Sequence, residues 1–145
     1  MILLDTSILV YAVGVEHPLR EPCRQVVGAV GEGRLTATTT VEVLQEFAHV
    51  CARRRSRADA VSLVERYAVL LAPLITVDAD DLALGMREFR EHAQLGAFDA
   101  VLAAVAQRRE HVRGLASADA AFSGIPALIH LNPADDEFAV RVGLA

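Results

Sequence analysis

The residue best suited to chemistry is a single carboxylate in an uncharged stretch of sequence. The segment LGAFDAVLAAVA, Leu95–Ala106, contains one charged residue, Asp99. A carboxylate among apolar side chains loses hydration when it is buried, and this loss is costly unless a compensating group faces it. We therefore expect a divalent cation to face Asp99.

Two further acidic residues follow predicted strands. Asp5 comes directly after the apolar run Ile2–Leu4, and Asp119 lies two residues beyond Ser117, where a later strand is predicted to end. In open α/β sheets, ligands collect at the carboxyl ends of the strands. Because Asp99 lies in the first turn of its helix, we expect the three carboxylates to meet at this edge of the sheet.

A fourth carboxylate is expected from the helix predicted over Val41–Arg55. Thr39 and Glu42 are three residues apart at the start of this helix, which is the spacing of a capping box and gives Glu42 a structural role. Glu46 lies one turn further along the same face. We assign Glu46 to the metal site and Glu42 to a supporting or capping role.

Carboxylates that crowd together repel one another, and burial strengthens the repulsion. A bound dication removes this conflict, and sites built from oxygen ligands alone favour Mg²⁺ or Mn²⁺, which also bind substrate phosphate. The predicted chemistry is hydrolysis of a phosphodiester by a water that the metal makes more acidic. Three of the acids also have a structural alternative, since Asp5 and Asp119 could cap helical turns and Asp99 could favour the positive end of its helix.

Composition narrows the function classes. The 145 residues are 53% hydrophobic, enough for one domain core, and their net charge of −5 argues against a general nucleic-acid coat protein. The 14 basic residues are all arginines, which excludes chemistry that needs lysine, such as a Schiff base or a P-loop. Two cysteines without metal-ligand spacing indicate a reducing, cytoplasmic compartment, and no apolar run is long enough to predict a membrane span.

Short apolar runs alternate with longer helical patterns. Strands are predicted at residues 2–4, 34–38, 74–77, 112–117 and 127–131, and helices at 18–30, 41–55, 56–71, 78–92 and 97–110. Ser56 with Asp59 and Asp78 with Asp81 are predicted helix caps. The connections are too long for hairpins, so we predict an α/β fold in which a mostly parallel, twisted sheet of four to five strands is flanked by helices on both faces.

Four segments together resemble a known family. Together they are similar to the PIN-domain ribonucleases, and in particular to the VapC-type toxins of bacterial toxin–antitoxin pairs. The segments, in chain order, are LLDTSILVY, VEVLQEFAHVCARRR, LGAFDAVLAAVA and GLASADAAF. The resemblance extends from Met1 to about Pro133. We therefore expect a single PIN-like domain over residues 1–133 and a less ordered C-terminal tail over residues 134–145.

The resemblance implies a PIN fold with an acidic pocket that holds Mg²⁺ or Mn²⁺. The family's catalytic acids fall on Asp5, Glu46, Asp99 and Asp119, of which Asp5, Asp99 and Asp119 would be metal ligands. Supporting hydroxyls would come from Thr6, Ser7 and Ser117, and Ser117 stands where the family often has threonine. Such proteins are expected to cleave single-stranded parts of structured RNA, such as tRNA or rRNA, to form homodimers, and to be silenced by a VapB-type antitoxin in the active-site groove.

An RNA substrate needs local positive charge, because phosphate contacts dominate nucleic-acid affinity. The candidate RNA-binding residues are Arg53, Arg54, Arg55, Arg87, Arg90, Arg108 and Arg109. Two alternatives stay open at this point. One is a PIN-like domain that binds RNA or a partner without turnover. The other is a haloacid-dehalogenase-like phosphatase with Asp5 as nucleophile, for which Ser7 stands where a second acid is expected and the phosphate-binding lysine is missing.

Overall fold

A short parallel sheet forms the centre of the molecule in the computed structural model, which describes residues 1–144. Its four strands are β1 (Ile2–Leu4), β2 (Ala37–Thr38), β3 (Leu115–Ala116) and β4 (His130–Leu131). They are hydrogen-bonded in the order β2-β1-β3-β4, and every pairing is parallel. All three residues of β1 are fully buried, which explains why this strand is apolar without alternation. The prediction of a mostly parallel sheet is confirmed.

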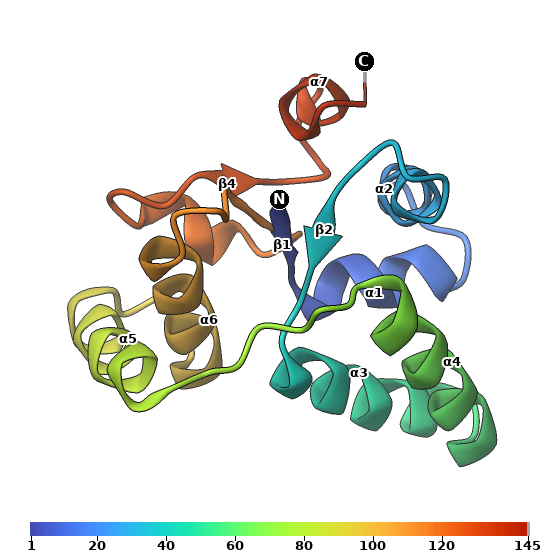
Figure 1. The fold of residues 1–145 in the computed structure, drawn as a ribbon, viewed down its shortest axis with the longest axis horizontal. Coiled ribbons are helices and arrows are strands. Elements are labelled where there is room, and N and C mark those ends of the chain that lie inside the picture. Colours follow the sequence, from blue (N-terminus) through green and yellow to red (C-terminus); the bar gives the residue numbers. More distant parts are fainter. Residues whose placement is uncertain (145) are drawn as a thin grey trace.

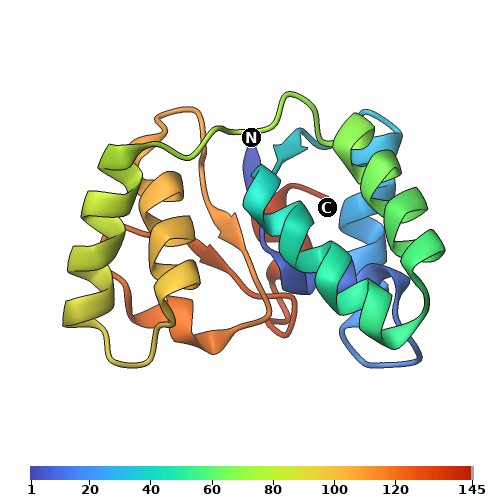
Figure 2. The ribbon, with the colours of Figure 1, turned by 90° about the horizontal axis from the view of Figure 1, so that it is seen from below.

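Helices surround this sheet within the described residues. They are α1 (Thr6–Val13), α2 (Arg20–Gly31), α3 (Val41–Arg54), α4 (Arg57–Leu70), α5 (Ala79–Glu91), α6 (Ala97–Arg108) and α7 (Phe138–Val142), and a 3₁₀-helix covers Ala120–Gly124. Figures 1 and 2 show the α5–α6 pair and the α3–α4 pair on opposite sides of the molecule, with β1 between them. The segment that joins α4 to α5 crosses from one pair to the other. Each helix of residues 1–144 is too short or too polar to span a lipid bilayer.

The α5–α6 pair is held by a buried ionic network and a close backbone contact. Asp78 caps α5 and forms a complete capping box with Asp81, as predicted. The Asp81 side chain is fully buried and accepts hydrogen bonds from Arg108 and Arg109 at the end of α6. Further along α5, Gly85 approaches α6 so closely that a Cβ would lie 2.7 Å from its backbone. These contacts fix the position of α6.

The strand predicted at residues 74–77 is not present as such. This segment makes one isolated parallel bridge, between Thr40 and Ile75, with a hydrogen bond from the Ile75 N–H to the carbonyl oxygen of Thr39 (2.9 Å). Its apolar side chains pack against the core from a connecting segment. An apolar run that lines the core without ladder hydrogen bonds has the same composition as a short strand, which explains the wrong prediction.

Helix α1 lies in a segment for which no helix was predicted. Its sequence, TSILVYAV, is apolar on most sides and therefore lacks the periodicity that indicates an amphipathic helix. Asp5 caps this helix by accepting a hydrogen bond from the N–H of Ser7 (3.3 Å). The helix consequently begins at the carboxyl end of β1 and extends away from it.

The C-terminal tail contributes to the core. Phe138 and Val142 of α7 are buried in the same hydrophobic cluster as the strands. Arg141 donates a hydrogen bond to the carbonyl oxygen of His130 in β4 (2.7 Å). The expectation of a less ordered tail is therefore wrong for this helix, because two apolar residues four positions apart give it a face to bury.

Candidate active site

The four predicted acidic residues line one pocket. Asp5 follows β1 directly, Asp119 lies shortly after β3, Glu46 is on α3, and Asp99 is in the first turn of α6. The pocket has a volume of about 560 Å³. Since β1 and β3 are neighbours in the sheet, the pocket lies where a parallel α/β fold gathers its ligands.

Asp5 is the most buried of the four acids, with 6% of its surface exposed. Its carboxylate accepts hydrogen bonds from the hydroxyls of Ser7 (2.6 Å) and Ser117 (2.7 Å). The Ser117 hydroxyl in turn accepts one from the N–H of Asp119 (3.0 Å). The two serines therefore tie the ends of β1 and β3 together at Asp5.

Glu46 is exposed on α3 and is also held by a hydroxyl. The Oγ1 of Thr6, at the start of α1, donates a hydrogen bond to Glu46 Oε2. The structure thus places each of the three predicted supporting hydroxyls next to one of the acids.

Glu42 does not line this pocket, and the capping box predicted between Thr39 and Glu42 is wrong. The cap of α3 is Thr40, whose hydroxyl accepts a hydrogen bond from the N–H of Val43 (3.2 Å). Thr39 is unavailable as a cap because its hydroxyl donates to the carbonyl oxygen of Leu4 in β1 (2.8 Å). Glu42 instead lines an apolar hollow of about 160 Å³ beside α6, and one of its carboxylate oxygens is buried with no hydrogen-bond partner in residues 1–144.

Asp99 is the acid whose charge is least compensated. It is half-buried, and within the described chain its carboxylate accepts no hydrogen bond. Burial and the negative charges of Asp5, Asp119 and Glu46 raise the pKa of Asp99 from 3.8 to about 7. The four acids therefore act on one another electrostatically, and Asp99 is the residue at which a cation would gain most.

The donor set fits a hard dication. Four carboxylates with neighbouring hydroxyls offer oxygen ligands alone, which Mg²⁺ and Mn²⁺ prefer. As the side chains stand in residues 1–144, no group of three or more His, Cys, Asp or Glu residues already forms a metal-binding arrangement. Asp5 and Glu46 are held by hydroxyls, and Asp119 caps the 3₁₀-helix through the N–H of Ala121 (2.8 Å). Joint coordination would require these carboxylates to approach one another more closely, and the hydrogen bonds leave each of them lone pairs for a metal.

One predicted RNA-binding arginine, Arg54, lines the acidic pocket. Arg53 and Arg55 flank it at the exposed end of α3, and Arg55 donates a hydrogen bond to the carbonyl oxygen of Val13 at the end of α1. Positive charge from this run therefore lies beside the acids.

The other four predicted arginines are not part of the pocket lining. Arg108 and Arg109 pair with Asp81, so their charge is used within the fold. Arg87 and Arg90 are exposed on α5. For these four residues RNA contact stays a prediction that the pocket geometry does not support.

Two aromatic rings outside the set of predicted site residues also line the pocket. Tyr11 of α1 and His17 of the following loop have ring centroids 4.6 Å apart. Tyr11 lies four residues after Ser7, which puts both on one face only if the segment is helical. Because no helix was predicted there, the spacing of Tyr11 from Ser7 did not indicate that they share a face.

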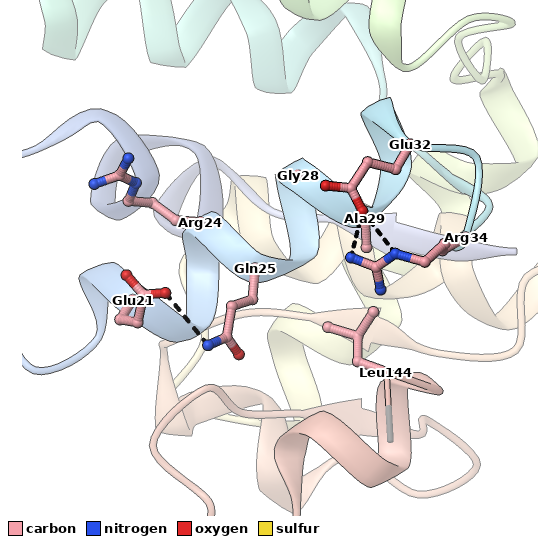
Figure 3. A pocket seen from close by; sticks show the side chains of 8 residues that line it. All are labelled: Glu21, Arg24, Gln25, Gly28, Ala29, Glu32, Arg34 and Leu144. Atoms are coloured by element: carbon pink, nitrogen blue, oxygen red, sulfur yellow. Dashed lines mark hydrogen bonds and ion pairs between the residues drawn. The ribbon is translucent and has the colours of Figure 1, made fainter.

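A second hollow, of about 480 Å³, lies along α2 near Leu144 (Figure 3). Four of its polar groups form two pairs: Arg34 with Glu32 (2.6 Å) and Gln25 with Glu21 (3.3 Å). None of the four clustered acids lines it. We therefore assign the candidate active site to the acidic pocket.

The sequence model of the PIN domain family matches residues 2–128, a span that includes all four acids. The chain belongs to the PIN domain family. Within that family it is similar to VapC ribonucleases. It is 45% identical over 137 residues to ribonuclease VapC7 of Mycobacterium tuberculosis, and the match covers 92% of each chain. It is 35% identical over 111 residues to ribonuclease VapC23 of the same species, and that match covers 75% of this chain and 86% of VapC23.

A solved structure shares the fold. It is that of VapC20 from Mycobacterium tuberculosis, described as a sarcin–ricin loop cleaving toxin, and it superimposes with a TM-score of 0.68 over 88% of this chain and 98% of VapC20. At 17% identity this likeness concerns the fold alone. The resemblance to VapC-type PIN domains inferred from the sequence motifs is confirmed.

Proposed function

We propose that this protein is a Mg²⁺- or Mn²⁺-dependent endoribonuclease that hydrolyses phosphodiester bonds in structured RNA and acts as the toxin of a VapBC-type pair. One observation carries the proposal: carboxylates from four separate parts of the chain, Asp5, Glu46, Asp99 and Asp119, line one pocket at the carboxyl ends of parallel strands. The ribonuclease activity in the names of VapC7 and VapC23 supports the reaction type. The raised pKa of Asp99 supports the need for a cation.

Asp5, Asp99 and Asp119 would hold the ion. When bound, it supplies positive charge for the phosphate oxygens and makes a water more acidic. Ser7 and Ser117 keep the Asp5 carboxylate in place through their hydroxyls.

Glu46 would orient the attacking water and accept its proton. A general base must lie within hydrogen-bond reach of that proton, and Glu46 is the solvent-exposed acid on the α3 side of the pocket. Thr6 restricts the carboxylate through its hydroxyl. Arg54 would bind an RNA phosphate, a task for which the planar guanidinium is suited.

Cleavage assays with tRNA and rRNA fragments test this function. Wild-type protein should cut in Mg²⁺ or Mn²⁺ and not in EDTA, and Asp5→Asn, Asp99→Asn and Glu46→Gln should each abolish cutting. Glu42→Gln, purified in the same way, is the matched control, because Glu42 lies outside the acidic pocket. Equal activity of Asp99→Asn and wild type would mean that the site is misplaced or that a contaminating nuclease is measured. Tight RNA binding by the wild type without cleavage would indicate a binding module.

The proposed partners, besides RNA, are a VapB-type antitoxin protein and a second copy of this chain. The VapC names of the relatives support an antitoxin, and the homodimer rests on the family resemblance. Light scattering of the purified chain, alone and with a co-expressed antitoxin, measures both. We place the protein in the cytoplasm, a proposal supported by two cysteines that are buried and unpaired.

A further inference from the structure

We propose that Tyr11 and His17 form a stacking platform for an unpaired nucleobase next to the scissile phosphate. The proposal rests on the nuclease function above and adds the residues that hold the base. Both rings line the acidic pocket, and no role in metal binding or proton transfer explains them. Aromatic side chains that stack on splayed-out bases are a common means of binding single-stranded nucleic acid.

One face of α1 connects this platform to the acids. Four residues at the start, middle and end of this helix line the pocket: Ser7, Val10, Tyr11 and Gly14. Their successive spacings of three, one and three residues place them on one face of the helix. Tyr11 is four residues beyond Ser7, whose hydroxyl donates to Asp5, so it lies about 6 Å further along the helix axis. A base on Tyr11 would therefore be about one nucleotide away from a phosphate held at the acids.

The two rings are held in place without a ligand. Their planes are tilted by 32°, with centroids 4.6 Å apart. The N–H of Leu19 donates to Nδ1 of His17 (3.1 Å), which orients the ring and leaves Nε2 to carry the proton of the neutral imidazole. Tyr11 is half-buried, whereas His17 is exposed. A preformed aromatic surface loses little conformational entropy when a base stacks on it.

The remaining lining suits a nucleotide. Val15, which is 86% exposed, extends the apolar surface beside the rings, and Arg54 supplies positive charge among four acids that would otherwise repel phosphate. The pocket thus offers one nucleotide of a single strand three kinds of contact. The rings would stack on its base, the arginine would bind a phosphate, and the acids would lie at the reacting bond. A base within a duplex is stacked on its neighbours and cannot use the platform.

Tyrosine fluorescence tests the platform without turnover. The chain has no tryptophan and two tyrosines, and Tyr67 is buried with its hydroxyl directed to the carbonyl oxygen of Leu9. The Tyr67→Phe variant therefore leaves Tyr11 as the sole emitter. In EDTA, a short single-stranded RNA should quench this emission saturably, and the same strand with abasic positions should not. Tyr11→Leu should weaken binding of the labelled intact strand by about 5- to 150-fold, whereas Tyr11→Phe should retain it.

Kinetics and the abasic strand separate stacking from a structural role. Tyr11→Leu and His17→Ala should raise KM for structured RNA more than they lower kcat, and both variants should bind the abasic strand as the wild type does. Wild-type affinity of Tyr11→Leu for the intact strand, or equal affinity of the wild type for intact and abasic strands, would overturn the proposal. So would variants that lose only the affinity for a protein antitoxin, since the rings would then serve that partner. Binding with quenching but no cleavage in Mg²⁺ or Mn²⁺ would support the platform and contradict the nuclease function.

Discussion

Replacing Asp99 by asparagine should stabilise the metal-free protein in a pH-dependent way. Burial and the charges of Asp5, Asp119 and Glu46 raise the pKa of Asp99 from 3.8 to about 7. The folded state therefore binds this proton more tightly than the unfolded state, and ionisation of Asp99 lowers the free energy of unfolding. This loss of stability is absent below about pH 4, where the Asp99 carboxyl group is protonated in both the folded and the unfolded state. It reaches its full size above about pH 7, where the carboxyl group is ionised in both states.

The size of the effect follows from these two pKa values. A separation of about three corresponds to about 4 kcal/mol above pH 7, since each tenfold change in proton affinity is 1.36 kcal/mol. Solvent near the half-buried side chain screens part of this energy. The asparagine also loses the favourable interaction of a negative charge with the N-terminus of α6, which subtracts up to about 1 kcal/mol from the expected stabilisation. We expect Asp99→Asn to raise the free energy of unfolding by about 2–3 kcal/mol at pH 8 and by little at pH 4.

Urea denaturation in EDTA at both pH values measures this difference. Asp136→Asn, which removes an exposed negative charge before α7, is the matched control. Added Mg²⁺ should narrow or reverse the difference, because a ligand at 100 times its Kd stabilises the state that binds it by about 2.7 kcal/mol, and the wild type would bind it better. A variant no more stable than the wild type at pH 8, or equally stabilised at pH 4 and pH 8, would refute the electrostatic argument.

Further variants test the site and the packing that positions it. Glu46→Gln should lower RNA cleavage by at least about 100-fold, whereas Glu42→Gln should stay near wild type; the reverse ranking would exchange their roles. Asp81→Ala should lower the free energy of unfolding at pH 7 by about 3 kcal/mol, because it removes the buried carboxylate that pairs with both Arg108 and Arg109 and leaves them only the more exposed carboxylates of Asp78 and Asp80. Burial opposes ionisation of Asp81, but hydrogen bonds from these arginines and a backbone N–H outweigh burial and lower the pKa of Asp81. The stability lost in the variant, measured by urea denaturation, should therefore persist at pH 5 and shrink only in more acidic solution. Gly85→Ala should destabilise the fold by about 1–3 kcal/mol, because its new methyl group meets the backbone of α6. Gly28→Ala in α2 is the control, since position 28 faces open space. Equal melting temperatures of the two variants would contradict this packing argument.

The convergence of the acids could be predicted because it depends on the order of elements rather than on their details. Asp5 and Asp119 follow strands that are parallel neighbours, so their proximity needs only the topology. Asp99 was identified by its apolar neighbours, which require α6 to be a buried helix. These arguments hold although β2, β3 and β4 have two residues each, since strand length does not enter them.

Details that depend on tertiary partners could not be predicted. Thr39 and Thr40 are adjacent and both can cap a helix, and the choice falls on Thr40 because Leu4 in β1 engages the Thr39 hydroxyl. Tyr11 belongs to the pocket only because its segment is a helix, and that helix has an apolar surface too broad for a periodic pattern. For the cap, the deciding contact comes from a strand distant in sequence, and for Tyr11 it is the helical conformation of its own segment.

Burial alone does not decide which acid has most need of a cation. Asp5 is more deeply buried than Asp99, yet two serine hydroxyls and a backbone N–H compensate its charge. Glu46 and Asp119 are exposed and accept one hydrogen bond each from Thr6 and a backbone N–H. Asp99 combines partial burial with three negative neighbours and no donor from residues 1–144. Positive charge therefore lowers the free energy of the pocket most when it is placed beside Asp99, and metal affinity should depend more on this residue than on the exposed Asp119.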